Sequence, residues 1–236
     1  MLHRGNLRRV VGASTIALLI AALMALYVAD IADAGPTRCQ QHRLDARERA
    51  ATVTGRGERV LVIGDSWSVG LGQEDLARSW ASRIPGEVHV SGFSGSGFSA
   101  AASGCGQVSF HDRAHTALGV RPQLVVVEGG LNDYDQPARA IDHGFRELMA
   151  DLVGHRVVVV CPATAPLRAG AVPRVDDQLQ VLADLYDVPY VRTSDLHLDY
   201  LDDRLHLTED GHRAFGDAVA DRLADVTPAR PALLGR

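Results

Sequence analysis

Five short apolar runs, separated by segments of helical periodicity, constrain the fold of this chain more than any other feature. The runs are Val60–Ile63, Val88–Val90, Leu124–Val127, Val157–Val160 and Tyr190–Val191. They are continuous rather than alternating, which is typical of strands buried on both faces of a parallel sheet. The alternation of strand and helix predicts an α/β fold, with three α/β/α layers around a doubly wound, parallel, five-stranded sheet.

Three of the intervening segments have the apolar spacing of helices that pack on such a sheet. Their apolar faces are Ile141, Phe145, Leu148 and Leu152; Val175, Leu179, Leu182 and Tyr186; and Phe215, Val219 and Leu223. Pro137 and Pro173 stand near the starts of the first two helices, where proline is tolerated. Thr208 is the expected N-cap of the third, because Glu209 and Asp210 follow it in the first turn.

The first 34 residues have the pattern of an export segment. An arginine-containing start precedes the uncharged run Val10–Ala29, and aspartates follow it. This charge order predicts a cytoplasmic N-terminus and an extracytoplasmic remainder. Ala32–Ala34 resembles a signal-peptide cleavage site, whereas about 20 apolar residues could also span a bilayer. Residues 1–34 are therefore interpreted as a signal peptide or a membrane anchor, and the second alternative implies membrane association through residues 10–29.

The remaining chain divides into three parts by composition. The polar stretch 35–57 is interpreted as a linker or a loosely packed lead-in, residues 58–227 as one folded domain, and residues 228–236 as a C-terminal tail. Cysteines outside the cytoplasm tend to pair, and the chain has three, Cys39, Cys105 and Cys161. We favour a Cys39–Cys105 pair. No cysteine or histidine spacing predicts a structural zinc site.

Charge and composition exclude several classes of function. The net charge is −5 and aromatic residues make up 5% of the chain, so neither a basic face nor a base-stacking surface for nucleic acid is expected. The 24 basic residues are all arginine. A Schiff-base lysine or a phosphate-binding P-loop is therefore excluded.

Polar residues gather where the predicted strands end. Gly64-Asp65-Ser66 follows the first strand, Ser91–Phe98 the second and Glu128–Asp135 the third, while Asp202–Leu207 lies shortly after the fifth. In a doubly wound sheet these segments meet at the carboxyl edge, where functional groups collect. A serine, a glycine-rich turn, an asparagine and an Asp-x-x-His motif on one edge are the components of a nucleophilic acyl-transfer site.

Each component has a chemical task in such a site. Ser66 is the expected nucleophile, His206 the base that takes its proton, and Asp203 the carboxylate that orients the imidazole. The main-chain N–H groups of Ser66 and Gly95 and the Asn132 side-chain amide are expected to bind the oxyanion. Taken alone, Ser66 is better interpreted as a cap of the following helix, and the other blocks reverse that interpretation.

These blocks resemble the SGNH, or GDSL, hydrolases. The resemblance rests on Gly-Asp-Ser, a glycine after the second strand, Gly130-Leu-Asn-Asp133 and Asp203-Arg-Leu-His206, in this order. It covers roughly residues 59–223 and implies a flavodoxin-like fold. It also implies the site roles given above for Ser66, Gly95, Asn132, Asp203 and His206, and no metal or organic cofactor.

Several residues compete with this assignment or depart from the family pattern. Trp67 replaces the usual leucine after the serine, which puts the shape of the substrate pocket in doubt. Gly97 is the second choice and Gly92 the third for the glycine donor. His212 lies inside the last helical pattern and is interpreted as a packing residue. The motif His111–His115 has the spacing of a metal-binding pair but lacks an acidic third ligand.

The sequence thus predicts an exported serine esterase that acts on small-molecule, glycan or lipid esters. Acetyl or short acyl esters of the cell envelope suit the predicted location. Two alternatives remain, an O-acyltransferase that uses the same residues and a non-catalytic carbohydrate- or lipid-binding module.

Overall fold

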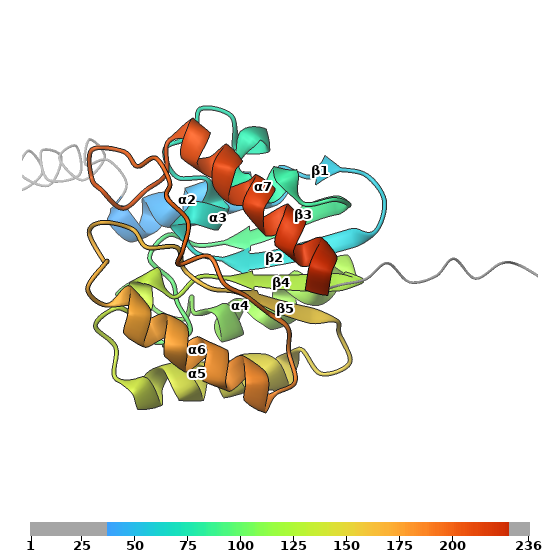
Figure 1. Ribbon diagram of the computed structural model, residues 1–236. Helices are drawn as coiled ribbons and strands as arrows, with labels where there is room; N and C mark the ends of the chain where they lie inside the picture. The colour runs from blue at the N-terminus through green and yellow to red at the C-terminus, as the bar shows by residue number, and fades with distance from the viewer. Residues whose placement is uncertain (1–36, 227–236) are drawn as a thin grey trace, which may run out of the picture. The chain divides into compact units, whose positions relative to one another are not determined.

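The computed structural model describes residues 37–226, and a mixed six-stranded sheet forms its centre (Figure 1). The strands are β1 (Thr54–Gly55), β2 (Arg59–Gly64), β3 (Glu87–Gly92), β4 (Leu124–Glu128), β5 (Val157–Val160) and β6 (Tyr190–Val191). Their order in the sheet is β1-β3-β2-β4-β5-β6. The five predicted strands are confirmed and run parallel. The short antiparallel edge strand β1 was not predicted, because two residues carry no periodicity.

β2 is the switch point of the sheet. It pairs with β3 on one side and with β4 on the other, so the chain passes from β2 to one side of the sheet and then returns past it to build the other side. Crevices form beyond the carboxyl ends of the strands at such a point. Ser66 lies two residues after the end of β2, and this topology therefore places it at an edge where loops from several strands can meet.

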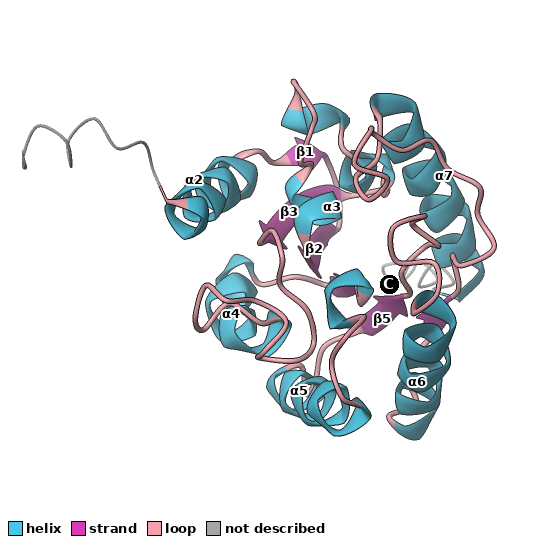
Figure 2. Ribbon diagram, turned by 90° about the vertical axis from the view of Figure 1, so that its left-hand side faces the viewer, coloured by secondary structure: helices cyan, strands magenta, loops and turns pink. Residues whose placement is uncertain are grey.

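Helices cover both faces of the sheet (Figure 2). They are α2 (Arg38–Ala51), α3 (Ser66–Val69), α4 (Phe110–Ala117), α5 (Ala138–Asp151), α6 (Val172–Leu185) and α7 (Glu209–Val226), with 3-10 turns η1 (Leu76–Arg78), η2 (Trp80–Arg83), η3 (Leu118–Val120) and η4 (Leu131–Asp133). The three predicted helices correspond to α5, α6 and α7. Thr208 caps α7, since its Oγ1 accepts from the N–H of Gly211 at 3.1 Å.

Two buried apolar clusters separate the layers. On one face, Val60 and Val62 of β2 pack with the α7 residues Phe215 and Val219. On the other face, alternate residues of the same strands pack with α4, α5 and α6. Successive side chains of β2 enter the two clusters alternately. Both faces of the strand are therefore buried, and its sequence must be a continuous apolar run.

The interpretation of residues 35–57 as a linker was wrong for most of its length. Residues 38–51 form the 14-residue helix α2, although the segment is rich in arginine and glutamine. Arg49 explains part of this, because its buried guanidinium donates to the carbonyl oxygens of Ser68 at 3.1 Å and Thr52 at 2.7 Å. Contacts of this kind leave no apolar pattern in the sequence.

Both termini of the chain lie outside the described residues, including the predicted export segment 1–34 and the tail 228–236. Among residues 37–226 no helix is both long and apolar enough to cross a bilayer. Cys39 and Cys105 are disulfide-bonded, as the favoured pairing requires, and Cys161 is a free, buried thiol.

Candidate active site

Ser66 is presented by a tight strand-to-helix turn. It is the first residue of α3, and the side chain of Asp65 caps this helix by accepting from the N–H of Trp67 at 2.9 Å. Ser66 retains 6% of its accessible surface. The serine thus stands at the end of β2, and its neighbour Asp65, not Ser66, does the capping.

Ser66, His206 and Asp203 form one hydrogen-bonded series. The Oγ atom of Ser66 lies 3.1 Å from Nε2 of His206, and Nδ1 of His206 lies 2.5 Å from Oδ2 of Asp203. When Nδ1 carries the proton and donates to the carboxylate, Nε2 is left to accept the serine proton. The structure therefore brings together three side chains that are up to 140 positions apart in sequence.

The Asp203 carboxylate is kept in its ionised form. Partial burial raises its pKa, but hydrogen bonds from the main-chain N–H and the imidazole of His206, and from the N–H of Leu205, outweigh burial and lower the pKa below its ordinary value. Both N–H groups donate to Oδ1 at 2.9 Å. Because Oδ1 is held by the main chain, Oδ2 is free to face His206. The neighbouring Asp202 has no such contact with the imidazole.

The three candidate glycines differ in the space around them. A Cβ atom on Gly92 would lie 2.8 Å from the main-chain nitrogen of Val69, and one on Gly97 would lie 2.4 Å from the Asp133 carboxylate. Both positions thus need glycine for close packing. Gly95 has open space instead, a φ of 82°, and an N–H with no acceptor among residues 37–226. An available donor in a left-handed turn favours Gly95 over its neighbours.

The side-chain amide of Asn132 contacts Asp65, the residue before Ser66, and its hydrogen bonds are already engaged. Its Nδ2 atom donates to Oδ2 of Asp65 at 3.1 Å and to the carbonyl oxygen of Ser96 at 2.9 Å. The asparagine thereby joins η4 to both the serine turn, residues 64–66, and the glycine loop, residues 93–98 after β3. An oxyanion could accept a hydrogen bond from this amide only if it shared the N–H with the carbonyl oxygen of Ser96 or displaced that carbonyl oxygen.

The buried carboxylate of Asp65 balances opposing influences. Burial raises its pKa to about 6, while the N–H of Trp67, the neighbouring His206 and the positive charges of Arg113 and Arg168 act in the opposite direction. The interpretation of Asp65 as a residue that ties loops together is confirmed by its contacts with Trp67 and Asn132.

Arg113 is the component of the site that the sequence did not reveal. Its guanidinium donates to the carbonyl oxygens of Val108, Ser91 and Gly64 and to the hydroxyl groups of Ser91 and Ser96. It therefore holds the ends of β2 and β3 and the glycine loop together. Burial lowers its pKa to about 10, which leaves it charged at neutral pH. In the sequence, Arg113 attracted attention only because it lies within the motif His111–His115.

The competing histidines have structural contacts. His212 is fully buried, and its Nδ1 accepts from the main-chain N–H of Trp80 at 3.3 Å. Burial lowers its pKa to about 4, so it is neutral at physiological pH. His111 contacts Asp151 through Nδ1 at 2.7 Å. Within the described part of the chain, no three His, Cys, Asp or Glu side chains are placed to hold a metal ion.

Comparison with known proteins identifies the family of this chain. The profile of the GDSL-like Lipase/Acylhydrolase family matches residues 62–214. No curated protein matches the chain. A solved carbohydrate acetylesterase from Sinorhizobium meliloti is similar in fold, with a TM-score of 0.59 and 19% identity, covering 72% of this chain and 100% of that one. An aryl esterase from M. smegmatis gives a TM-score of 0.56 at 19% identity, covering 72% and 99%. The chain belongs to the GDSL-like lipase/acylhydrolase family and is an SGNH serine hydrolase.

Proposed function

We propose that this protein is an exported esterase in which Ser66 attacks the carbonyl carbon of an acyl ester. The observation that carries the proposal is the hydrogen-bonded series from Ser66 Oγ through His206 to the ionised carboxylate of Asp203. A serine hydroxyl needs a base within hydrogen-bond reach before it can attack, and Nε2 of His206 lies at 3.1 Å.

The reaction follows from these positions. His206 takes the Ser66 proton as Oγ bonds to the carbonyl carbon, and the resulting imidazolium is stabilised by Asp203. The imidazolium then protonates the leaving alcohol, which gives an acyl-Ser66 intermediate. His206 next takes a proton from water, whose oxygen attacks the acyl carbon. As the bond between the acyl carbon and Oγ breaks, the imidazolium returns this proton to Ser66 Oγ and the acid is released.

The oxyanion of each tetrahedral intermediate requires donors that are already in place. The main-chain N–H of Gly95 is available, and the N–H of Ser66 stands at the start of α3. Asn132 would supply the third donor by turning one N–H away from the Ser96 carbonyl. Asp65 would keep the asparagine in place during this change, because it binds the same amide nitrogen.

Acetyl or short acyl esters of envelope glycans or small lipids are the proposed substrates. The predicted export segment at residues 1–34 supports this location, and one similar structure is described as a carbohydrate acetylesterase. Transfer of the acyl group to a sugar hydroxyl would use the same intermediate, with the sugar in place of water.

The test uses the full-length protein and its Ser66→Ala variant. Both are assayed with p-nitrophenyl acetate, butyrate and octanoate and with an acetylated oligosaccharide, with and without an added sugar acceptor. We expect free acid from the wild-type protein, faster turnover of the shorter chains, and no turnover by S66A. Acylated acceptor in preference to free acid would make the protein a transferase. No turnover of any ester by the wild type would contradict the proposal.

The location is tested separately in the producing cell. Fractionation and intact-mass measurement of the mature protein distinguish a chain that begins after Ala34 from one that retains residues 1–34 in the membrane. Recovery of the full-length chain in the cytoplasm would contradict export.

A further inference from the structure

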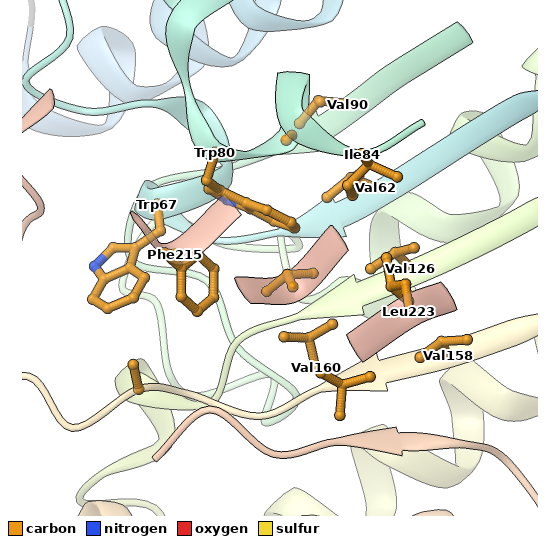
Figure 3. Close-up of a cluster of buried hydrophobic side chains, with 14 of the residues drawn as sticks. Val62, Trp67, Trp80, Ile84, Val90, Val126, Val158, Val160, Phe215 and Leu223 are labelled. Atoms are coloured by element: carbon orange, nitrogen blue, oxygen red, sulfur yellow. The ribbon is translucent and has the colours of Figure 1, made fainter. Parts of the chain in front are cut away.

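Trp67 is buried and therefore does not line a substrate pocket. It retains 1% of its accessible surface and packs edge-on against Phe215 at 5.2 Å between ring centroids, with Tyr200 at 6.1 Å (Figure 3). Its indole nitrogen lies on the side away from Phe215 (Figure 3). A buried indole N–H needs an acceptor. The identity of that acceptor indicates what Trp67 does.

The acceptor is the main chain next to the proposed base. Nε1 of Trp67 donates to the carbonyl oxygen of Leu205 at 3.0 Å. Trp67 follows Ser66 in the sequence, and Leu205 precedes His206. One hydrogen bond thus joins the residue after the proposed nucleophile to the residue before the proposed base, across 138 positions.

The His206 loop, residues 199–207, holds its own shape. Leu201 and His206 are linked through their main chains, Tyr200 pairs with Leu207, and Asp203 accepts from two N–H groups of the same loop. The contact between His206 and Asp203 is therefore internal to the loop and survives any small displacement of the loop as a whole.

The distance between Ser66 and His206 is different, because it depends on where the loop docks. Among residues 37–226, the hydrogen bonds that connect residues 200–206 to other segments are those from Trp67 and from the N–H of Leu167, and the Ser66–His206 contact itself. The Leu167 contact, at 2.9 Å, goes to Arg204 on the far side of Leu205. Trp67 is thus the tether next to His206.

We propose that Trp67 is a positioning residue, whose indole N–H sets the distance between Ser66 Oγ and His206 Nε2 by anchoring the His206 loop. This role rests on the proposed function. A loop that moves by about 1 Å retains its His206–Asp203 pair but loses the serine contact, and a misplacement of that size can cost about 100-fold in rate.

The chain contains a matched control for the bulk of the indole ring. Trp80 is also fully buried and also packs edge-on against Phe215 at 5.2 Å (Figure 3). Its Nε1, however, has no partner within the described residues. Replacing either tryptophan by phenylalanine removes a similar buried volume from one cluster, but only Trp67→Phe removes a hydrogen bond to the His206 loop.

The test compares W67F and W80F with the wild type in turnover of p-nitrophenyl acetate, in the rate of labelling by a fluorophosphonate, and in thermal unfolding by circular dichroism. We expect kcat and the labelling rate of W67F to fall by about 10- to 100-fold, with KM within about twofold. The pH profile of W67F should keep its shape, since the His206–Asp203 pair is intact. W80F should unfold at a lower temperature, as W67F does, but keep the wild-type kcat.

Two outcomes separate this inference from the proposed function. An active wild type with W67F as fast as W80F, or with a loss that only matches its unfolded fraction, would overturn the role of Trp67 alone. A wild type that neither hydrolyses the ester nor reacts with the fluorophosphonate would contradict the proposed function, and with it the role of Trp67.

Discussion

The two halves of the candidate site are built in opposite ways. The buried half contains the serine turn, the glycine loop and η4, and its residues Asp65 and Ser66 retain 1% and 6% of their accessible surface. The other half is the His206 loop, where the side chain of Asp203 is 47% exposed. One half is part of the core, and the other lies on the surface of the molecule.

The halves also differ in what holds them. In the buried half, Arg113 and Asp65 join segments from β2, β3, η4 and the glycine loop through long-range hydrogen bonds. The His206 loop uses short-range bonds, and its main chain accepts two hydrogen bonds from other segments, from Trp67 and from Leu167. Substitutions in the buried half should therefore lower stability and activity together, whereas substitutions in the loop should lower activity alone.

The largest expected effect is that of His206→Ala. Removing the base should lower kcat/KM for p-nitrophenyl acetate by about 10,000-fold or more. The free energy of unfolding in urea should change by less than about 1 kcal/mol, because the partner carboxylate of Asp203 is 47% exposed and a contact at the surface contributes little. A loss of activity below about tenfold would remove His206 from the mechanism.

Arg113→Lys comes next and affects the buried half. Lysine cannot reproduce the five hydrogen bonds of the guanidinium, so the variant should lose about 3–5 kcal/mol of unfolding free energy. Its folded fraction should also have a lower kcat, since the glycine loop loses its anchor. Arg146→Lys, on the exposed face of α5, is the control and should behave as the wild type. Equal stability of the two variants would show that Arg113 does not organise the site.

Asn132→Ala should lower kcat by about 100- to 1,000-fold if its amide binds the oxyanion. It should also lower stability by about 1–3 kcal/mol, because Asp65 and the Ser96 carbonyl each lose a buried partner. Steady-state kinetics and urea unfolding measure the two effects. A stability loss with unchanged kcat would assign Asn132 a structural role only.

The smallest effect concerns His212 and acid pH. Its pKa is about 4 in the folded protein and about 6.5 when unfolded, so the unfolded chain binds more protons between these values. Stability should therefore fall as the pH falls from about 6.5 to 4, by on the order of 2–3 kcal/mol from this group. In His212→Asn, whose Oδ1 can still accept from the Trp80 N–H, that part of the decrease should be absent. Urea unfolding of both proteins at pH 7 and pH 4.5 measures the difference, and parallel curves would contradict it.

The sequence was informative where local patterns carry the information. Valine-rich runs predicted the central strands β2, β4 and β5 because both of their faces are buried, and the threonine before Glu209 predicted the start of α7. The hydrogen-bonded series of Ser66, His206 and Asp203 could be predicted because Asp203 and His206 are close in sequence and Ser66 follows a strand at the switch point.

The missed features depend on contacts between distant segments. Helix α2 lacks a continuous apolar face, and Arg49 binds carbonyl groups that no sequence pattern indicates. In the sequence, Arg113 stood only inside the candidate metal-binding motif His111–His115. Its actual role could not be predicted, because its five acceptors come from four separate positions in the chain. Trp67 suggested a pocket residue, although its partner lies 138 positions away.

The most direct measurement is the site of covalent labelling in the full-length protein. The wild type and S66A are treated with a fluorophosphonate, and the adduct is mapped by peptide mass spectrometry. One adduct on Ser66, absent from S66A and much slower to form in H206A, is the predicted result. An adduct on another residue, or equal labelling of S66A, would contradict the assignment of Ser66 as the nucleophile.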